Sequence, residues 1–84
     1  METKEVVGID ASKLTLDCCI HGRGLQSEFG NDPAGIEGMI HWAMESTKLA
    51  REQVLFIFEH TGLYTDQLTH ALSAKGCALY IASG

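Results

Sequence analysis

Basic residues are scarce in this chain of 84 residues: six Lys and Arg stand against eleven Asp and Glu, which gives a formal net charge of −5. A protein that binds nucleic acid by itself usually carries an excess of Lys and Arg, because these residues replace the counterions of the phosphates. Any contact of this chain with DNA or RNA therefore needs metal ions, a further basic segment or a partner.

Long hydrophobic runs are also missing. Apolar runs such as residues 54–58 are far shorter than the ~20 residues of a membrane-spanning helix, and residues 1–5 lack the layout of a signal peptide. The three cysteines give no disulfide framework, because their number is odd and Cys18 and Cys19 would point to opposite faces of a strand. We expect no membrane and a reducing, cytoplasmic setting, with Cys18, Cys19 and Cys77 as small core residues.

Proline occurs once, and the rest of the composition is that of a small folded domain. Hydrophobic residues make up 45% of the chain and charged residues 20%, which excludes a disordered or collagen-like protein. The length allows a single domain.

The apolar pattern of the first part of the chain predicts three strands. Residues 6–9 form a short apolar run, typical of a strand buried on both faces, and this run stops at Asp10. Residues 14–20 and 25–29 are two further strands, separated by the glycine-rich turn 21–24. Strands joined this closely should form an antiparallel meander.

The period then changes to one typical of a helix. Asp32 is a suitable N-cap and Pro33 a suitable first helical residue. Apolar residues follow at spacings of three and four, and these are Ile36, Met39, Ile40 and Ala43. We expect this helix to fray near residues 48–51.

The last part of the chain predicts a strand, a helix and a strand. Residues 54–58 are apolar and β-rich and end at Glu59, and the pair Thr61 and Gly62 opens a second helix. Its expected apolar face carries Tyr64, Leu68, Ala71 and Leu72. Gly76 suits a left-handed C-terminal cap before the final strand, residues 77–82. Each of the last two strands follows a helix, so both should run parallel to their neighbours in an α/β fold with a mixed sheet.

Two of the predicted strands end in a carboxylate, at Asp10 and Glu59. Ligands of open α/β sheets gather beyond the carboxyl ends of the parallel strands, and neighbouring strands lie only about 4.8 Å apart. Two anions this close repel each other unless a cation lies between them, and Mg²⁺ and Mn²⁺ favour oxygen ligands. Such ions support phosphodiester chemistry. The sequence leaves open the alternative that both acids only cap the turns after their strands.

Two motifs resemble those of one protein family. Residues 7–13, Val-Gly-Ile-Asp-Ala-Ser-Lys, with Leu16 and Asp17 after them, resemble the opening of the insertion-sequence transposases that have an N-terminal RuvC-like DEDD domain. This family includes the Piv-type DNA invertases. Residues 59–64, Glu-His-Thr-Gly-Leu-Tyr, are similar to its second signature, a Glu followed by a Thr-Gly pair and an aromatic residue. The resemblance extends over essentially the whole chain, and further residues that fit it are Phe29, Gly30, Asn31, Gly35 and Trp42.

The resemblance implies an RNase H-like fold with a five-stranded mixed sheet in the order 3-2-1-4-5. It makes Asp10 and Glu59 the first two ligands of a four-member Asp-Glu-Asp-Asp site for Mg²⁺ or Mn²⁺. Residues 1–84 would then be the N-terminal part of the catalytic domain, cut before its last two acidic residues. The family cleaves and rejoins DNA at transposon ends and targets, as oligomers and in some members with a guide RNA.

The chain departs from the family pattern in two ways. His60 stands where a small residue is expected, and the third and fourth acidic residues lie beyond Gly84. We therefore expect this fragment to bind metal weakly and to be inactive without the rest of the transposase.

Three residues near the carboxylates are candidates for contact with a nucleic-acid phosphate: Ser12, Lys13 and Thr61. Each also has a local alternative. Ser12 and Lys13 suit hydrogen bonds within their own turn, and Thr61 suits the N-cap of the second helix. We expect Asp17 on a solvated face of the sheet and His60 as an exposed bystander.

Two other classes of function stay open at this stage. An actin-like or sugar-kinase-type ATPase lobe also begins with a strand, an Asp and a hairpin that cradles phosphate, but residues 11–14 lack the glycine that such a loop needs. A non-enzymatic assembly module would pair subunits through the last strand, because an unpaired edge strand favours self-association.

Overall fold

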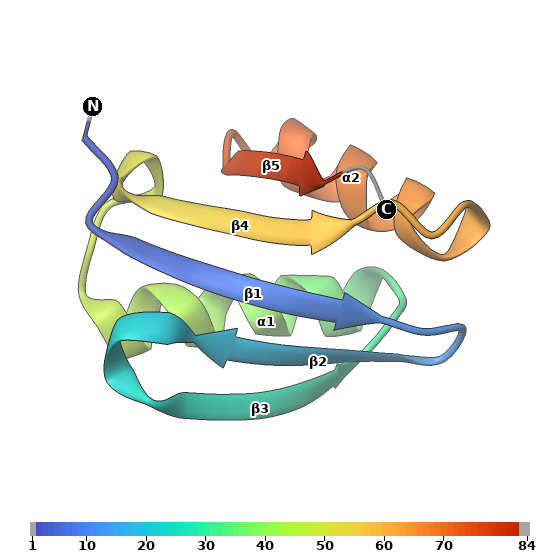
Figure 1. Ribbon diagram of the computed structural model, residues 1–84, viewed down its shortest axis with the longest axis horizontal. Coiled ribbons are helices and arrows are strands. Elements are labelled where there is room, and N and C mark those ends of the chain that lie inside the picture. The colour runs from blue at the N-terminus through green and yellow to red at the C-terminus, as the bar shows by residue number, and fades with distance from the viewer. Residues whose placement is uncertain (1, 83–84) are drawn as a thin grey trace.

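The computed structural model describes residues 2–82 and contains one five-stranded mixed sheet with two α-helices (Figure 1). The elements are, in chain order, β1 (Glu5–Ala11), β2 (Thr15–Ile20), the 3-10 helix η1 (His21–Arg23), β3 (Leu25–Gly30), α1 (Pro33–Thr47), the 3-10 helix η2 (Arg51–Gln53), β4 (Val54–Glu59), α2 (Leu63–Ala74) and β5 (Ala78–Ala82). The strand order is β3-β2-β1-β4-β5, with β1, β2 and β3 antiparallel and β4 and β5 parallel to β1. The expected α/β class, meander and strand order are confirmed.

Helix α1 begins where the sequence predicts it. The side chain of Asp32 accepts a hydrogen bond from the backbone N–H of Gly35 at 2.7 Å, and Pro33 occupies the first turn. At the other end Lys48 adopts a left-handed conformation with φ of 58°, and its N–H donates to the carbonyl of Met44. The helix therefore stops at Thr47, one residue before the range in which fraying was expected.

The core lies between the sheet and the two helices, both of which cover the same face (Figure 1). Alternate residues of the central strands point into this core, as the period of a strand requires. The largest fully buried side chains come from both layers and include Phe56, Leu16, Ile20, Ile36, Met39, Leu68 and Leu72.

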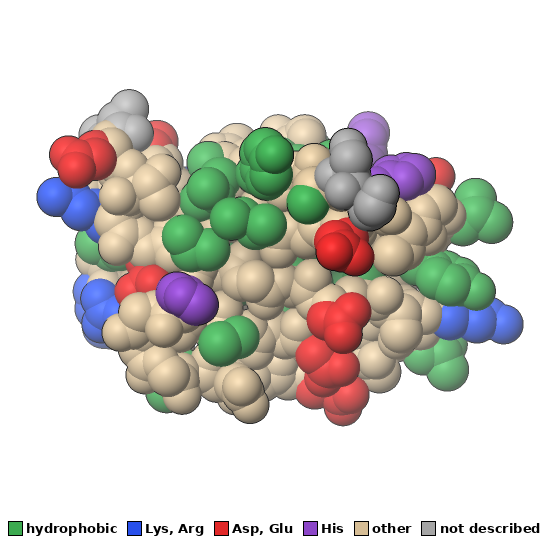
Figure 2. Space-filling view, in the orientation of Figure 1, with side chains coloured by type: hydrophobic (Ala, Val, Ile, Leu, Met, Phe, Trp, Pro, Cys, Tyr) green, Lys and Arg blue, Asp and Glu red, His purple; other side chains and the backbone are tan. Residues whose placement is uncertain are grey.

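The opposite face of the sheet is left uncovered by the described residues. Figure 2 shows this face, with apolar side chains gathered over β4 and β5 and acidic side chains at one end of the strands. Ile57 is half-buried here and lies opposite Gly8 on one side and Tyr80 on the other, and Tyr80 is 59% exposed. Parallel strands are usually apolar on both faces because both faces are covered, whereas this side of β4 has no cover among the described residues.

Two local expectations for the meander and the cysteines hold only in part. The predicted tight turn at 21–24 is the 3-10 helix η1 followed by Gly24, which has a left-handed φ of 62°. Cys18 and Cys77 are buried as expected, but Cys19 is only half-buried and its side chain belongs to the uncovered face.

The start of α2 differs from the prediction. Thr61 does not cap the helix: Gly62 is the N-cap residue, with a φ of 61°, and no side chain caps the first turn. Tyr64 was expected on the apolar face but is 44% exposed, and Thr65 is fully buried in its place beside Leu68 and Leu72. The end of the helix agrees with the sequence, since Gly76 has a φ of 72°.

The end of the sheet opposite to Asp10 is tied together by Glu5. Its carboxylate accepts hydrogen bonds from the N–H groups of Gly22 at 2.8 Å and Val6 at 3.1 Å, and Arg23 lies 3.5 Å away. These amide hydrogen bonds, helped by the Arg23 guanidinium, lower the pKa of Glu5 from its ordinary value. Arg23 also donates to the last carbonyls of α1, at Ser46 and Thr47, so this cluster connects β1, η1 and α1.

Within residues 2–82, no helix is long and apolar enough to cross a bilayer.

Candidate functional site

Asp10 and Glu59 lie side by side at the ends of β1 and β4. These strands are parallel neighbours whose last paired residues are Ile9 and Phe58, so the two carboxylate residues follow directly after this pair. Ile9 and Phe58 point into the core, and the alternation of a strand turns Asp10 and Glu59 to the uncovered face, where both are exposed. The structure therefore brings together the two acids that the sequence singled out.

Both acids line one small hollow at the strand ends. The hollow has a volume of about 320 Å³, and its walls are Ile9, Asp10, Ala11, Glu59 and Thr61. A wider hollow of about 450 Å³ continues from it across the uncovered face, past Gly8, Cys19 and Ile57. The space beside Gly8 is open, because a Cβ atom at position 8 would have no neighbour within 4 Å.

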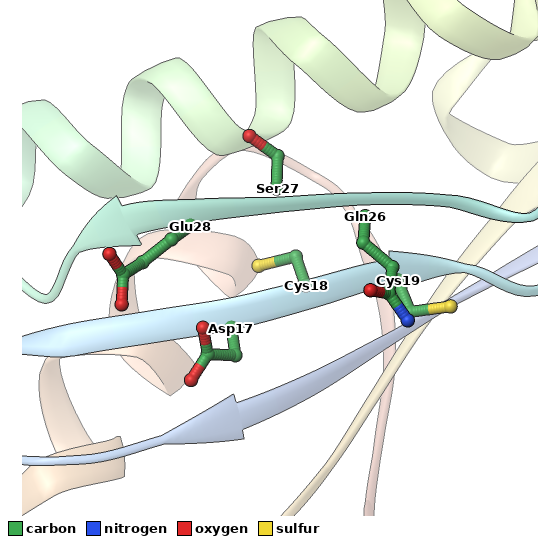
Figure 3. Close-up of a pocket in the computed structure, with 6 residues that line it drawn as sticks. All are labelled: Asp17, Cys18, Cys19, Gln26, Ser27 and Glu28. Carbon is green, nitrogen blue, oxygen red and sulfur yellow. The ribbon is translucent and has the colours of Figure 1, made fainter.

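Two more acids lie beyond Asp10 on the next two strands, so that a row of four carboxylates, Glu59, Asp10, Asp17 and Glu28, crosses the sheet. Asp10 pairs with Asp17 on β2, and Asp17 pairs with Glu28 on β3. The carboxylates of Asp17 and Glu28 lie on the same side of their strands (Figure 3), and all of these acids are exposed. The predicted exposure of Asp17 is confirmed, but its position opposite Asp10 was missed, and so was Glu28. The position of Asp17 opposite Asp10 could have been predicted, because the short loop 12–14 and the two-residue period of a strand together fix the register of β1 and β2.

The row makes one end of the uncovered face strongly negative. Like charges directly opposite each other on neighbouring strands destabilise a sheet, and a cation placed between them removes the repulsion. In the described part of the chain, no three His, Cys, Asp or Glu side chains are arranged to hold a metal ion. Mg²⁺ is commonly bound through one or two carboxylates and keeps several waters, and Asp10 and Glu59 are ligands of this chemical type.

The three residues predicted to contact a phosphate differ in the hydrogen bonds they already make within the chain. Ser12 is engaged locally, with its Oγ 2.8 Å from the hydroxyl of Thr15 and 3.2 Å from the N–H of Thr15. Lys13 is exposed in the same loop. Thr61 lies at the rim of the small hollow, where its backbone N–H donates to the Oγ1 of Thr65 at 3.2 Å.

His60 is exposed, as expected. Its Nε2 lies 4.0 Å from a carboxylate oxygen of Asp66, and its backbone N–H donates to the carbonyl of Ala82. The residue thus extends the contact between β4 and β5, and its ring does not line the hollow between Asp10 and Glu59.

The sequence includes Asn31 among the residues that fit the family resemblance, but its contacts were missed. Its side-chain amide donates to the carbonyl of Ser12, just after β1, and to the carbonyl of Tyr64, in the first turn of α2. No local signal predicts these bonds, because their partners lie far away in the sequence.

Comparison of the chain with protein-family models and with curated proteins gave no match.

Proposed function

We propose that this chain is the N-terminal part of a RuvC-like, RNase H-like DEDD transposase domain, in which Asp10 and Glu59 bind Mg²⁺ or Mn²⁺ for DNA cleavage and strand transfer. One observation carries the proposal: the two carboxylates follow the last paired residues of neighbouring parallel strands and line the same hollow. The resemblance of the motifs around residues 10 and 59 supports the family, and the position of the two acids on one hollow supports a shared site.

The residues of the chain would act by holding the ion and by leaving room for substrate. A bound divalent ion supplies the electrostatic stabilisation of the attacking and leaving oxygens of a phosphodiester. Asp10 and Glu59 would hold it, while Asp17 adds negative potential that attracts a divalent cation to this end of the sheet. Thr61 lines the small hollow and Lys13 is exposed in the loop after β1, and both carry groups that suit a DNA phosphate. Ser12 is the weaker candidate because its hydroxyl is bonded to Thr15.

The surrounding charge explains why partners are part of the proposal. With a net charge of −5, the chain needs the metal ion, the rest of a transposase or a guide RNA to hold DNA. We propose that it works in the cytoplasm within a larger homo-oligomeric protein that supplies the other two acidic ligands, and that residues 1–84 alone do not catalyse the reaction.

The test is a metal titration of the chain followed by NMR. Mg²⁺ should shift the backbone signals of Asp10, Glu59 and their neighbours, and Mn²⁺ should broaden the same signals. Asp10→Asn and Glu59→Gln should each abolish the response. Glu52→Gln is the matched control, because Glu52 is an exposed acid in η2 at the opposite end of β4.

A second test uses the full-length protein. Asp10→Ala or Glu59→Ala should eliminate transposon excision without unfolding the domain, whereas Glu52→Gln should leave excision unchanged. Excision at the normal frequency in either alanine variant would contradict the proposal.

The ATPase alternative gains no support from the loop after β1. A phosphate cradle needs free backbone N–H groups, but the N–H of Ser12 donates to the carbonyl of Thr15 at 2.9 Å. Thermal stabilisation of the chain by ATP, without an effect of Mg²⁺ alone, would favour that alternative.

A further inference from the structure

Asn31 joins three parts of the fold that are distant in sequence. It lies in the short connection between β3 and α1, and its backbone N–H donates to the carbonyl of Leu14 at 2.9 Å. Its side-chain Nδ2 donates at 2.8 Å to the carbonyl of Ser12 and at 2.8 Å to the carbonyl of Tyr64. One residue thus connects the loop after β1 with the beginning of α2.

The chemistry of these contacts suits a side-chain amide. Both partners are carbonyl oxygens, so the side chain must donate twice, and the Nδ2 of an amide carries two N–H donors. This orientation leaves the Oδ1 of Asn31 buried and without a hydrogen-bond partner among the described residues. A buried acceptor left unpaired destabilises the fold. The two hydrogen bonds that Nδ2 donates to the carbonyls of Ser12 and Tyr64 compensate for this unpaired acceptor.

The hydrogen bonds of Asn31 to Ser12 and Tyr64 lie beyond the point at which β1 and β4 stop pairing. The pairing of β1 with β4 ends at Ile9 and Phe58. Beyond that point Asp10 is paired only with β2, and Glu59 only with β5. The β1–β4 ladder therefore ends one residue before the two carboxylate residues, and beyond that point their separation also depends on the segments that follow them.

Asn31 bridges the segments that continue from them. Ser12 follows Asp10 by two residues, and Tyr64 follows Glu59 by five. We propose that Asn31 is the positioning residue of the Asp10–Glu59 pair, because its amide holds the loop after β1 against the start of α2 and so sets the spacing of the two carboxylates. The part of this inference that concerns metal binding rests on the proposed function, whereas the link between the two segments does not.

Two substitutions test the link in complementary ways. Asn31→Ala removes the side-chain bonds. Asn31→Asp keeps the volume and the backbone N–H to Leu14, but an ionised carboxylate cannot donate and would face two carbonyl oxygens. Thr47→Ala is the matched control at the other end of α1, because the buried Thr47 hydroxyl donates to Ala43 and accepts from the N–H of Leu49, far from both loops.

The first readout is amide hydrogen exchange. Both Asn31 variants should accelerate exchange about tenfold at Ser12, Asn31 and Tyr64 together, while the amides in the middle of β1 and β4 keep the rate of the wild-type chain. Thr47→Ala should leave the two loops unchanged at a comparable loss of thermal stability. If Asn31→Ala does not fold, Asn31→Asp gives the same readout. Protonation of the introduced carboxylate at low pH restores one donor, so the ratio of the variant's exchange rates to those of the wild-type chain at the same pH should fall.

The second readout is Mg²⁺ affinity, followed by the NMR shifts of Asp10 and Glu59. Loss of a hydrogen-bond partner of a metal ligand commonly weakens metal binding about 10–100-fold. Asn31 bonds only to the carbonyls of Ser12 and Tyr64, so we expect a loss at the lower end, about tenfold, in both Asn31 variants and none in Thr47→Ala. Unchanged loop exchange together with unchanged Mg²⁺ affinity in the Asn31 variants would overturn the inference. A wild-type chain that does not respond to Mg²⁺ would instead contradict the proposed function, and loop exchange would still decide whether Asn31 links the two segments.

Discussion

Asp10 and Asp17 lie directly opposite each other on β1 and β2, with both side chains on the uncovered face of the sheet. Opposed like charges at such a position cost the sheet on the order of 0.2–1 kcal/mol. A divalent cation bound at this site would remove the repulsion between the two carboxylates. The two negative charges therefore lower the stability of the metal-free fold and, in the proposed function, favour metal binding.

The first prediction follows from this opposition. Asp17→Asn should raise the free energy of unfolding in metal-free buffer by roughly 0.5 kcal/mol, because it removes the repulsion with Asp10. The same change should weaken Mg²⁺ binding, so that added Mg²⁺ stabilises the variant less than the wild-type chain. Urea unfolding with and without Mg²⁺ measures both effects. Lower stability of the variant without metal would show that the two charges are not in repulsive contact.

The second prediction concerns the close approach of α1 to the end of β3. A Cβ atom at Gly35 would overlap the backbone of Gly30, which cannot move without shifting the helix. Gly35→Ala should therefore destabilise the fold by about 1–3 kcal/mol or more. Gly38 is the control in the same helix, because a Cβ there would reach only ordinary contact with the ring of Phe29 at 3.7 Å.

Gly38→Ala should leave stability unchanged or raise it by about 0.5 kcal/mol, since alanine favours the helix. Thermal unfolding of the two variants side by side gives the comparison. Equal effects of the two substitutions would mean that the contact between Gly35 and Gly30 does not limit the helix position.

The third prediction is a pH dependence that arises from Glu5. Its folded-state pKa is lowered from the ordinary 4.5, chiefly by the N–H groups of Gly22 and Val6. The unfolded chain then binds the proton more readily, so the stabilisation is fully present above 4.5 and is lost as the pH falls through the lowered pKa. Glu5→Gln should be less stable at neutral pH and should show a flatter stability profile in acid.

Urea unfolding of both proteins across the acid range provides that profile. Glu2→Gln is a suitable control, because Glu2 is an exposed acid near the same end of β1. Parallel profiles of wild type and Glu5→Gln would contradict the assignment of this acid sensitivity to Glu5.

The fourth prediction separates the cysteines by reactivity. Burial raises the pKa of Cys18 to about 12, with the nearby charge of Asp17 adding to the shift, and burial also raises the pKa of Cys77. Both thiols should therefore resist alkylation in the folded chain, because the thiolate is the reactive form. Cys19 is half-buried on the uncovered face and should be modified first.

Mass spectrometry after brief treatment with iodoacetamide locates the label. One modified cysteine, lost in Cys19→Ser, is the expected result, and denaturant should make all three available. Rapid labelling of Cys18 would indicate that β2 opens far more readily than its position in the core implies.

Much of this protein follows from short-range signals in its sequence. The N-cap Asp32 and the following Pro33 start a helix through their own geometry, and the apolar periods mark the strands and the faces of α1 without reference to other segments. The two strand-end acids were recognisable for the same reason, since an apolar run that stops at a carboxylate is a local pattern. The order of the strands came from the family resemblance, and the structure agrees with it.

What only the tertiary structure decided are relationships between segments distant in the chain. The alignment of Asp17 and Glu28 with Asp10 depends on strand register, and the bonds of Asn31 to Ser12 and Tyr64 depend on where two loops meet. Thr61 was misjudged as a cap, because a capping preference describes a side chain and not the left-handed backbone that Gly62 adopts in its place. Local preference comes from the conformations open to each residue, whereas register and long-range hydrogen bonds form only once the core has brought the elements together.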